Sequence, residues 1–541
     1  MRRAETYFAG SPQAAPVTVT EALLARRLLD GILAGKLDRS TLQNEKLRLA
    51  AEMRIVALPS NADILAYASP SERPSVEAVL RKRPTRSISG VTIVTVQTSP
   101  EACPHGKCTY CPGGPEFGTA QSYTGDEPAA RRAARHAFDP FGQTMGRLAD
   151  LHATGHPTDK VDFIIQGGTF TARDESYQRE FVKRALDAMN GSDSPTLAEA
   201  QARNESAQSR MIGLTIETKP DWALPKDVDL SLELGCTRYE VGVQTVFDDI
   251  LRATHRGHTM RETVESFQAV KDAGLKLCAH VMPGQPGSDY DKDLETFRQM
   301  FADPRFAPDM LKIYPTLVIK GTSLFKQWES GSYEPVTEEY CVKLLAEAKE
   351  MAPRWLRIQR IDRDIPSPRI EAGVKKLNLR ELVHAEMKKR GTRCQCIRCR
   401  EAGHIANKEN RAPRDVTLTR AQYDSAGGHE HFLSMEDVQQ DILVGFVRLR
   451  EPSPHAHRVE VKDALLLREL KVFGSEVPIG ESAGEGLHQH RGHGAYLVTQ
   501  SEDLARELGR KRVLVTAGVG VRPYYAKLGY ARLGPYMAKE V

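Results

Sequence analysis

Apolar, β-rich runs alternate with amphipathic helical patterns between residues 91 and 318, and this alternation limits the fold more than any other feature of the chain. The six runs begin at residues 91, 161, 213, 238, 276 and 310. Residues 175–191, between two of the runs, have helical periodicity and end in Gly191, a common helix stop. The apolar face of this helix comprises Tyr177, Phe181, Val182, Ala185, Leu186 and Met189. Strands and helices in alternation predict a parallel sheet with crossover helices, so we expect an α/β protein built on an incomplete (β/α)6 barrel.

Three cysteines, Cys103, Cys108 and Cys111, follow the first run in the spacing C-x4-C-x2-C. They lie beyond the C-terminal end of a strand, where barrels of this kind carry their active sites. Three thiolates can hold three irons of a 4Fe–4S cluster and leave the fourth iron open to a small molecule. The spacing therefore indicates a reactive iron–sulfur cluster.

Two other metal sites are compatible with the same spacing. A structural zinc ion would take the three thiolates and a fourth ligand such as His105. A plant-type ferredoxin cluster would need one further, distant cysteine. The cysteines that remain for that role are Cys236, Cys278 and Cys341. We expect these three to be ordinary buried thiols, because they lie in apolar patterns.

A second triplet, Cys394, Cys396 and Cys399, has the spacing C-x-C-x2-C. His404 follows five residues later and is the expected fourth ligand, with His384 as the alternative. Three thiolates and one imidazole make a closed tetrahedral zinc site, which is structural because no position is open to a substrate. With six of nine cysteines in two such triplets, a disulfide framework is excluded.

Positive charge is concentrated in two segments, although the net charge is only +4. Residues 1–90 hold 14 Lys and Arg against 9 Asp and Glu, and residues 375–414 hold 12 against 4. Localised positive charge is typical of nucleic-acid binding, although solvated helix faces have a similar composition. In the first segment we expect an extended basic run over residues 81–86 and an amphipathic helix over residues 21–37. The side chains expected to point inward are Leu23, Leu24, Leu28, Leu29, Ile32 and Leu33.

The pattern changes after residue 415. Runs at residues 441–450, 457–474 and 513–519 predict an antiparallel or mixed sheet. Between the last two runs, Gln489, Gly492 and Gly494 precede an apolar-periodic helix that ends near Leu508. Glycines at a helix N-terminus leave backbone N–H groups open to a phosphate, so this turn predicts a pyrophosphate site, with a plain surface turn as the alternative.

The barrel part resembles the radical S-adenosylmethionine (SAM) superfamily. The resemblance implies that Cys103, Cys108 and Cys111 bind a 4Fe–4S cluster and that the methionine end of SAM chelates its open iron. Gly167 and Gly168 resemble the strand-end glycine pair that meets the methionine amino group. The C-terminal part resembles the GNAT acetyltransferase fold, a mixed-sheet α/β domain in which a helix N-terminus receives the pyrophosphate of coenzyme A.

Ten short motifs, taken in order, resemble the catalytic subunit family of the Elongator complex in its archaeal and bacterial stand-alone form. They are CPHGKCTYCPGG, AQSYTGDEP, GGTFTA, IETKPDW, YEVGVQT, RGHT, MPGQPG, RELKVFG, QHRGHG and YYAKLGY, and the match extends to the C-terminus. Membership would imply a tRNA enzyme that uses acetyl-CoA and a 5′-deoxyadenosyl radical from SAM. Its product would be 5-carboxymethyluridine at the wobble position of tRNA.

The same resemblance implies the residues of an acetyl-CoA site. Lys160 and Tyr525 are expected to be catalytic as well as to contact the cofactor. The other contacts, including those of the pyrophosphate turn, are expected at Glu469, Leu470, Lys471, Val472, Gln489, Gly492, His493, Gly494, Ala495 and Tyr496. Lys160 lies at the start of a barrel strand, so its role would join the two parts of the chain.

We divide the chain into a basic helical segment (1–87), a radical SAM barrel (88–373), a basic zinc-binding linker (374–415) and a GNAT-like domain (416–541). The N-terminal basic segment is expected to grip the body of the tRNA, and the basic linker is expected to present Lys and Arg to tRNA phosphates. The tRNA partner is expected to be bound through its anticodon stem-loop. The sequence has no run of about 18 apolar residues and no apolar signal core, so we expect a cytoplasmic protein without a membrane partner. A homodimer is left open, and no Elongator partner can be inferred.

Two other functions compete with this interpretation. A protein lysine acetyltransferase would use only the C-terminal domain, with Glu469 as a candidate general base. A non-catalytic RNA-binding scaffold would hold structural metals at both cysteine triplets.

Overall fold

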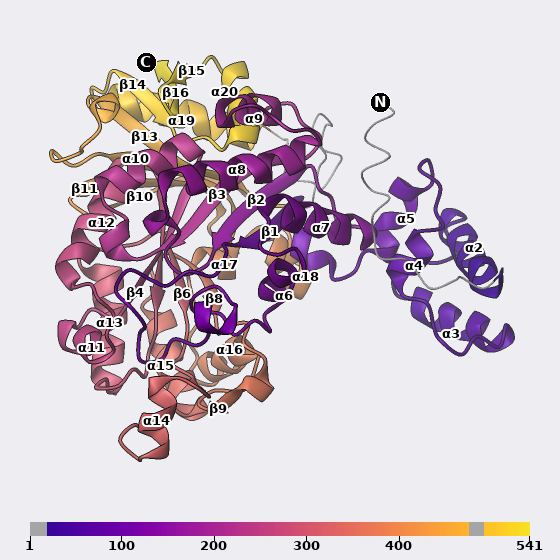
Figure 1. The fold of residues 1–541 in the computed structure, drawn as a ribbon. Coiled ribbons are helices and arrows are strands. Elements are labelled where there is room, and N and C mark those ends of the chain that lie inside the picture. Colours follow the sequence, from indigo (N-terminus) through magenta and orange to yellow (C-terminus); the bar gives the residue numbers. More distant parts are fainter. Residues whose placement is uncertain (1–18, 475–491) are drawn as a thin grey trace.

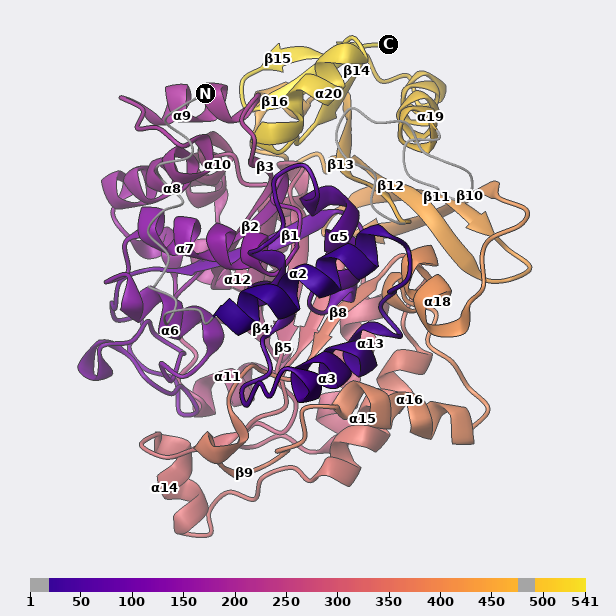
Figure 2. The same ribbon diagram turned by 90° about the vertical axis from the view of Figure 1, so that its right-hand side faces the viewer.

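The computed structural model describes residues 19–474 and 492–541, so the predicted contact residue Gln489 lies outside the described part. The described residues form a group of N-terminal helices, a barrel-like parallel sheet with its helices, and a C-terminal mixed sheet (Figure 1). The N-terminal helices stand to one side of the body, whereas the mixed sheet packs against the barrel (Figures 1 and 2).

The barrel sheet has the strand order β1-β2-β3-β4-β5-β6-β8, with parallel pairing throughout. Its strands are β1 (Val91–Gln97), β2 (Lys160–Gln166), β3 (Arg210–Thr218), β4 (Arg238–Gln244), β5 (Lys276–Val281), β6 (Met310–Ile313) and β8 (Arg357–Ile361). The strands predicted from the apolar runs are confirmed. The pattern does not predict β8, because Arg357 and Arg360 interrupt its apolar residues, and this strand extends the expected (β/α)6 arrangement.

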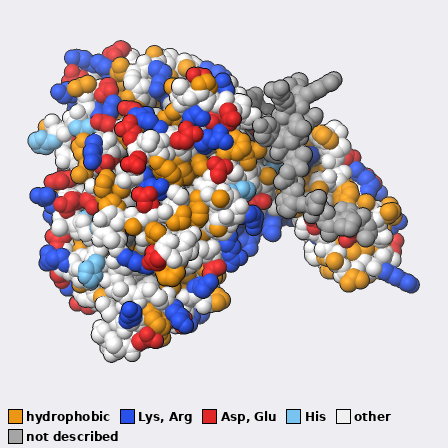
Figure 3. Space-filling view, viewed as in Figure 1, with side chains coloured by type: hydrophobic (Ala, Val, Ile, Leu, Met, Phe, Trp, Pro, Cys, Tyr) orange, Lys and Arg blue, Asp and Glu red, His pale blue; other side chains and the backbone are white. Residues whose placement is uncertain are grey.

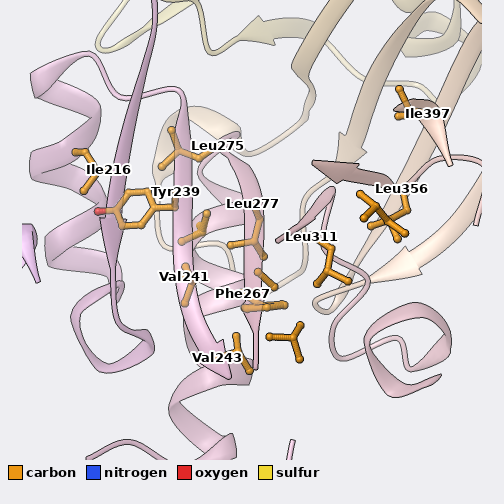
Figure 4. Packing of buried hydrophobic residues seen from close by; sticks show 14 of the residues in the cluster. Ile216, Tyr239, Val241, Val243, Phe267, Leu275, Leu277, Leu311, Leu356 and Ile397 are labelled. Carbon is orange, nitrogen blue, oxygen red and sulfur yellow. The ribbon is translucent and has the colours of Figure 1, made fainter. Parts of the chain in front are cut away.

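Helices cover the outer face of the barrel sheet (Figure 1). They are α6 (Pro128–Arg135), α7 (Pro140–Ala153), α8 (Glu175–Asn190), α9 (Leu197–Asn204), α10 (Pro225–Leu234), α11 (Asp248–Ala253), α12 (Met260–Asp272), α13 (Tyr290–Ala302) and α15 (Glu338–Glu350). Helix α14 (Ser323–Glu329) instead lies at the lower end of the molecule in Figure 1. The predicted helix is α8, which ends at Gly191 with φ of 68° and buries the predicted apolar face, Tyr177 only in part. Apolar side chains from the strands, among them Val241 and Leu277, pack against Phe267 of α12 (Figure 4).

The C-terminal sheet is mixed, in the order β10-β11-β12-β13-β14-β16-β15. Its strands are β10 (Thr417–Ser425), β11 (Gly428–Asp437), β12 (Ile442–Glu451), β13 (Ala464–Val472), β14 (Arg512–Val515), β15 (Ala531–Leu533) and β16 (Tyr536–Glu540). Only β13 and β14 pair in parallel. The predicted runs correspond to β12, β13 and β14, whereas the polar residues of β10 and β11 conceal those strands in the sequence. Helices α19 (His493–Glu507) and α20 (Arg522–Lys527) contribute to a second core on this sheet.

The N-terminal helices have a small core of their own. They are α2 (Val19–Leu33), α3 (Leu42–Glu52), α4 (Asn61–Leu65) and α5 (Arg73–Leu80). The prediction for α2 was wrong at Leu23 and Leu33, which are 51% and 41% exposed because they lie at the border of the buried stripe. The predicted extended run at 81–86 was also wrong: residues Pro84–Ser87 form a 3-10 helix, since Pro84 fixes φ at its first position.

Short elements lead from the barrel to the mixed sheet. Strands β7 (Val318–Ile319) and β9 (Ile370–Ala372) pair antiparallel, and α16 (Leu379–Lys389), α17 (Ile397–Arg400) and α18 (Ala402–Glu409) follow. Across the described ranges, no helix is long and apolar enough to cross a membrane.

Buried ion pairs join the barrel to the mixed sheet. Asp309, just before β6, accepts hydrogen bonds of 2.8 and 2.6 Å from the Arg468 guanidinium of β13. Arg468 also donates to Glu430 of β11 at 2.8 Å, and Lys271 Nζ of α12 lies 3.3 Å from the same carboxylate. Arg448 of β12 lies 3.4 Å from Asp309. These contacts fix the position of one sheet relative to the other.

The charges in this interface are balanced. Arg450 donates to Asp272 at 2.6 Å, and Arg448 lies 3.4 Å from Glu469. The cations are Lys271, Arg448, Arg450 and Arg468, and the carboxylates are Asp272, Asp309, Glu430 and Glu469. All eight side chains are buried, so the loss of any one leaves a partner charge without compensation in a region of low dielectric constant.

We predict that Asp309→Asn destabilises the contact between the two sheets by about 3–5 kcal/mol, the usual cost of breaking a buried ion pair. The urea midpoint should be followed by tryptophan fluorescence, because Trp355 stacks on Tyr423 of β10 at 4.1 Å in this interface. The control is Glu507→Gln, which breaks an exposed pair with Arg420 and should leave the midpoint unchanged. Equal midpoints for Asp309→Asn and wild type would contradict the prediction.

Candidate functional site

The first cysteine triplet lies on the loop between β1 and α6, at the C-terminal ends of the barrel strands. Cys108 and Cys111 are buried and Cys103 is half-buried. Burial raises the pKa of Cys103 and Cys111, and neighbouring hydrogen-bond donors oppose this rise. The Gln121 amide lies 3.1 Å from Cys111 Sγ, and the Thr169 hydroxyl lies 3.5 Å from Cys103 Sγ. Such hydrogen bonds stabilise metal-bound thiolates and tune the potential of a cluster.

The spacing of the sulfur atoms differs between the two triplets. The Sγ atoms of Cys394, Cys396 and Cys399 all lie within 4.8 Å of one another. One zinc ion needs this closeness, because Zn–S bonds of about 2.3 Å in a tetrahedron bring sulfurs to about 3.8 Å. Among the described residues, the first triplet does not form such a group. Its wider spacing fits a cluster of several irons and disfavours a single zinc ion.

Two glycines border this loop. Gly167 and Gly168, which follow β2, have φ of 131° and 72°, values that favour glycine. A Cβ atom on Gly167 would lie 2.2 Å from Thr98 Oγ1. A Cβ atom on Gly168 would lie 3.0 Å from Gln121 Cβ and 3.4 Å from Cys103 Sγ. A side chain at either position would therefore collide with neighbouring side chains, so the end of β2 and the cysteine loop can pack closely only because these residues are glycines.

Positive charge surrounds the cysteine loop. The buried Arg256 guanidinium lies 3.7 Å from Cys108 Sγ and donates to the Gly242 carbonyl at 2.8 Å. Lys219, also buried, lies 3.2 Å from Asp221. Burial lowers the pKa of His105 to about 3, with further lowering from Lys219 and Arg256, so this imidazole is neutral at pH 7. The remaining cations match the negative charge of a thiolate-bound cluster, and the residues present therefore fit a 4Fe–4S group.

The other cysteines are accounted for by packing. Cys236, Cys278 and Cys341 are buried, as predicted. Cys278 also lies within a group of possible metal ligands with Glu240 and His280. The Lys312 ammonium contacts Glu240 and already supplies the cation there. Although burial opposes it, Lys312 and His280 hold the pKa of Glu240 well below its ordinary value.

The second triplet lies beside His384, not His404. His384 Nε2 lies 3.8 Å from Cys399 Sγ, on α16. The expected ligand His404 instead has its Nε2 atom 2.7 Å from Glu401 Oε1, and neither imidazole belongs to the group formed by the three cysteines. Burial lowers the pKa of His384 to about 4, which keeps its imidazole in the neutral form that binds metals.

The expected acetyl-CoA residues gather where two strands of the mixed sheet separate. β13 and β14 pair from Ala464 to Leu467, but β14 ends at Val515 while β13 continues to Val472. Within the described residues, β14 thus gives no strand partner to the last part of β13. That part contains Glu469, Leu470, Lys471 and Val472, of which the last three are half-buried.

The N-terminus of α19 carries the remaining expected contacts. Gly492 precedes the helix with φ of 84°, and a Cβ atom on Gly494 would lie 3.0 Å from Tyr524 Oη. His493, Ala495 and the 44% exposed Tyr496 lie in the first turn of the helix. Tyr525 is buried, with its ring 5.2 Å from that of Tyr524. The structure thus brings α20 to the start of α19.

Lys160 is the first residue of β2 and lies near the mixed sheet. It is in register with Arg210 of β3. Gly520 packs so closely on Arg210 that a Cβ atom there would lie 2.5 Å from Arg210 Cβ. Gly520 comes shortly before Tyr525 in the chain. Lys160 therefore lies one strand away from the segment that leads into α20.

Several polar residues at the barrel rim have no role in the sequence analysis. Gln121, Thr169 and Arg256 contact the cysteines, and Tyr123 and Lys312 contact the carboxylates inside the barrel. All except Lys312 lie in or beside the motifs AQSYTGDEP, GGTFTA and RGHT, which were used only for the resemblance. The motifs could have identified these residues, but spacing alone does not show which side chains meet.

The protein has a parallel barrel sheet with three cysteines at its C-terminal rim, and this sheet is joined to a mixed sheet. These features define a radical SAM protein with an additional C-terminal domain. Family models agree with this class. The radical SAM superfamily matches residues 99–300, the radical SAM C-terminal domain matches residues 308–389, and the ELP3 N-terminal domain matches residues 21–88.

Comparison with named relatives shows which family within this class the chain belongs to. The chain is 48% identical over 525 residues to the tRNA uridine(34) acetyltransferase of Methanocaldococcus jannaschii, covering 95% of this chain and 97% of that protein. It is 42% identical over 509 residues to Elongator complex protein 3 of Homo sapiens, covering 92% and 93%. The solved structure of Methanocaldococcus infernus Elp3 with an N-terminal deletion matches with a TM-score of 0.75 at 44% identity, covering 84% of this chain and all of that one. The chain belongs to the Elongator complex protein 3 family.

We predict that Gly168→Ala lowers the iron and sulfide content per chain several-fold after anaerobic reconstitution, because the new methyl group would contact Gln121 and Cys103. The matched control is Gly191→Ala, which has a similar φ of 68° but no neighbour within 4 Å. Both variants carry the backbone cost of about 1–2 kcal/mol for a left-handed residue. Equal iron content in the two variants would contradict the prediction.

Proposed function

We propose that this protein is a tRNA-modifying enzyme that forms 5-carboxymethyluridine at the wobble position from acetyl-CoA and SAM. The observation that carries the proposal is the combination of a cluster-type cysteine loop with a glycine-opened helix N-terminus in one rigidly joined body. When bound, the cluster supplies the electron that cleaves SAM to the 5′-deoxyadenosyl radical, which takes a hydrogen atom from the acetyl methyl group.

The residues of the barrel rim prepare the radical site. Cys103, Cys108 and Cys111 would hold the cluster, and Gly167 and Gly168 let the end of β2 pack closely beside Cys103, where the resemblance expects the methionine end of SAM. The surrounding hydrogen-bond donors stabilise the thiolates, and burial of Cys108 and Cys111 limits access of water to that part of the loop.

The residues of the mixed sheet would hold acetyl-CoA. The backbone N–H groups at Gly492 to Ala495 face a position suited to the pyrophosphate. Within the described part of the chain, β14 does not pair with β13 from Glu469 to Val472, and the backbone groups on that side would be offered to the amides of the pantetheine arm. Tyr525 and Lys160 would border the thioester end, Tyr525 from α20 and Lys160 from the barrel.

A cluster of arginines supports contact with tRNA phosphates. Burial lowers the pKa of Arg132 to about 10, and the charges of Arg147 and Arg135 lower it further. Burial lowers the pKa of Arg147, and the charge of Arg86, which belongs to the basic run at 81–86, lowers it further. Lys and Arg side chains gather where the N-terminal helices meet the body (Figure 3). Arginines that repel one another in this way favour a polyanion.

Four features of the sequence analysis remain predictions. They are the domain limits 1–87, 88–373, 374–415 and 416–541, contact with the anticodon stem-loop, the cytoplasmic location and a homodimer. The proposed chemistry needs only the contact with tRNA.

The function is tested by anaerobic incubation of the reconstituted enzyme with reductant, SAM, acetyl-CoA and tRNA. Wild type should yield 5′-deoxyadenosine and the modified nucleoside, and Cys103→Ala should yield neither. Lys160→Ala and Tyr525→Phe should lower kcat/KM for acetyl-CoA by about ten-fold, equivalent to about 1.4 kcal/mol. Lys226→Ala, at an exposed lysine of α10, is the control. Absence of both products from wild type would refute the proposal.

The alternative of a protein lysine acetyltransferase finds less support. Its candidate base, Glu469, is buried and its carboxylate lies 3.4 Å from the Arg448 guanidinium. A carboxylate in a buried ion pair is a poor base for a substrate amine. Peptide acetylation without SAM or reductant would favour this alternative.

We also propose that Cys394, Cys396, Cys399 and His384 bind a structural zinc ion. His384→Ala should lower zinc per chain well below one after dialysis, because three thiolates then remain. His404→Ala should keep its zinc, because His404 bonds Glu401 instead. Metal analysis of both variants checks the assignment, and zinc loss only in His404→Ala would reverse it.

A further inference from the structure

Charged side chains line the inside of the barrel at the N-terminal ends of its strands, on the side of the mixed sheet. Asp162 of β2, Arg238 of β4 and Lys276 of β5 lie there. Leu277, the next residue of β5, packs outward against Phe267 of α12 (Figure 4). Successive side chains of a strand point to opposite faces, so the half-buried Lys276 points into the barrel.

Lys276 lies close to the part of β13 that is expected to bind acetyl-CoA. Burial lowers the pKa of Lys276 and of Lys471, and the charges of Glu469 and Asp162 oppose this change for both lysines. The two ammonium groups therefore share one carboxylate of β13 and one of β2 as electrostatic neighbours. Lys160 is two residues before Asp162, on the same face of β2. Lys276 thus lies inside the barrel beside the expected position of the thioester.

The other cations at this end of the barrel already have neighbours that compensate their charge. The guanidinium groups of Arg238 and Arg357 lie 3.2 and 2.6 Å from carboxylate oxygens. The Lys471 ammonium lies 5.5 Å from the centre of an aromatic ring. Across residues 19–474 and 492–541, no hydrogen-bond acceptor and no carboxylate within 4.0 Å holds the Lys276 ammonium. An ammonium withdrawn from water without an acceptor is costly, and its three N–H groups are open to a ligand.

The proposed reaction contains a step that needs a donor at this place. Acetyl-CoA carries a thioester, whereas 5-carboxymethyluridine carries a carboxylate, so water must cleave the thioester bond. Water adds to the carbonyl carbon and the C–S bond breaks. Coenzyme A leaves as a thiol with one proton, and a second proton goes to solvent. The carbonyl oxygen is negatively charged in the intermediate, and a donor placed beside it stabilises that charge.

We propose that Lys276 donates a hydrogen bond to the thioester carbonyl oxygen of acetyl-CoA and stabilises the oxyanion that forms during hydrolysis. The proposal rests on the proposed function, because it assumes that acetyl-CoA lies along β13 with its thioester toward the barrel. It adds a catalytic residue on β5 to the contacts that the resemblance implies.

A purely structural role for Lys276 makes a different prediction. If the ammonium only balanced Asp162 and Glu469, its loss would change the affinity for coenzyme A ligands with and without a carbonyl oxygen by the same factor. The ratio of the two affinities therefore separates contact with the thioester from a structural effect.

The test uses the full-length enzyme and two ligands, acetyl-CoA and the thioether ethyl-CoA, which has a methylene group in place of the carbonyl. Titration calorimetry gives the Kd of each ligand. Wild type should prefer acetyl-CoA by about ten-fold or more, as expected for a hydrogen bond from a charged donor. Lys276→Met keeps the length of the side chain and should lower this preference by about ten-fold. Lys226→Met, at an exposed lysine of α10, is the matched control and should keep the wild-type ratio.

The rate of thioester cleavage provides a second measurement. In the complete reaction with tRNA, Lys276→Met should lower kcat for release of the coenzyme A thiol by about a hundred-fold, the usual cost of removing one oxyanion donor. Lys276→Arg keeps a cationic donor and should recover most of this loss.

Lys276→Gln carries the test if Lys276→Met does not fold, because its amide keeps an N–H donor without the charge. It should lower the preference for acetyl-CoA by a smaller factor. A wild-type ratio near one, or an unchanged ratio in the Met and Gln variants, would overturn the inference alone. Failure of wild type to bind either ligand would overturn the inference and count against the proposed function as well.

Discussion

The interface between the two sheets depends on the ion pairs around Asp309 and Arg468. These side chains are buried and hydrogen-bonded to each other through two N–H groups, a geometry that a small displacement would break. Because neighbouring charges alternate in sign, the mixed sheet can satisfy its arginines only in one position on the barrel. The relative position of the two candidate sites follows from this constraint.

That position places the two sites at opposite ends of the barrel strands. Lys160 begins β2 on the side of the mixed sheet, and Gly167 follows the end of β2 beside the cysteine loop. Seven strand residues span about 20 Å. Catalysis by the proposed route therefore requires the acetyl group to reach along the length of a barrel strand, and the interface sets the distance that the pantetheine arm must cover.

The parts of the fold that the sequence predicts are those with a continuous apolar signal. β1 to β6 and α8 have uninterrupted apolar faces. The composition of the glycine turn before α19 predicts the start of that helix. β8 and β10 carry charges on accessible positions and β11 carries charges on buried positions, so the apolar periodicity of all three strands is hidden. The prediction that α2 is an amphipathic helix is correct. The width of its buried stripe was not predicted, because that width depends on how the neighbouring helices pack.

The sequence predicts which types of residue form the candidate sites, but it does not predict all the residues that contact them. Cysteines that lie close together in the sequence predict a metal site from their spacing alone. The spacing does not show which imidazole lies near them: His384 Nε2 lies 3.8 Å from Cys399 Sγ and comes from another helix, whereas His404 contacts the adjacent Glu401. Glu217 likewise acquires its surroundings only when β2, β3 and β6 lie side by side.

Charges also continue through the interior of the barrel between the two sites. Asp162 lies 3.2 Å from Arg238, Arg238 lies 3.7 Å from Glu240, Glu240 contacts Lys312, and Lys312 lies 3.9 Å from Glu217. The central members, Arg238, Glu240 and Lys312, are buried. Each charge is held by neighbours of opposite sign, which makes the ladder sensitive to the loss of any member. Its upper end positions the Glu217 carboxylate at the rim, so the charges at the barrel centre also hold this side chain in place.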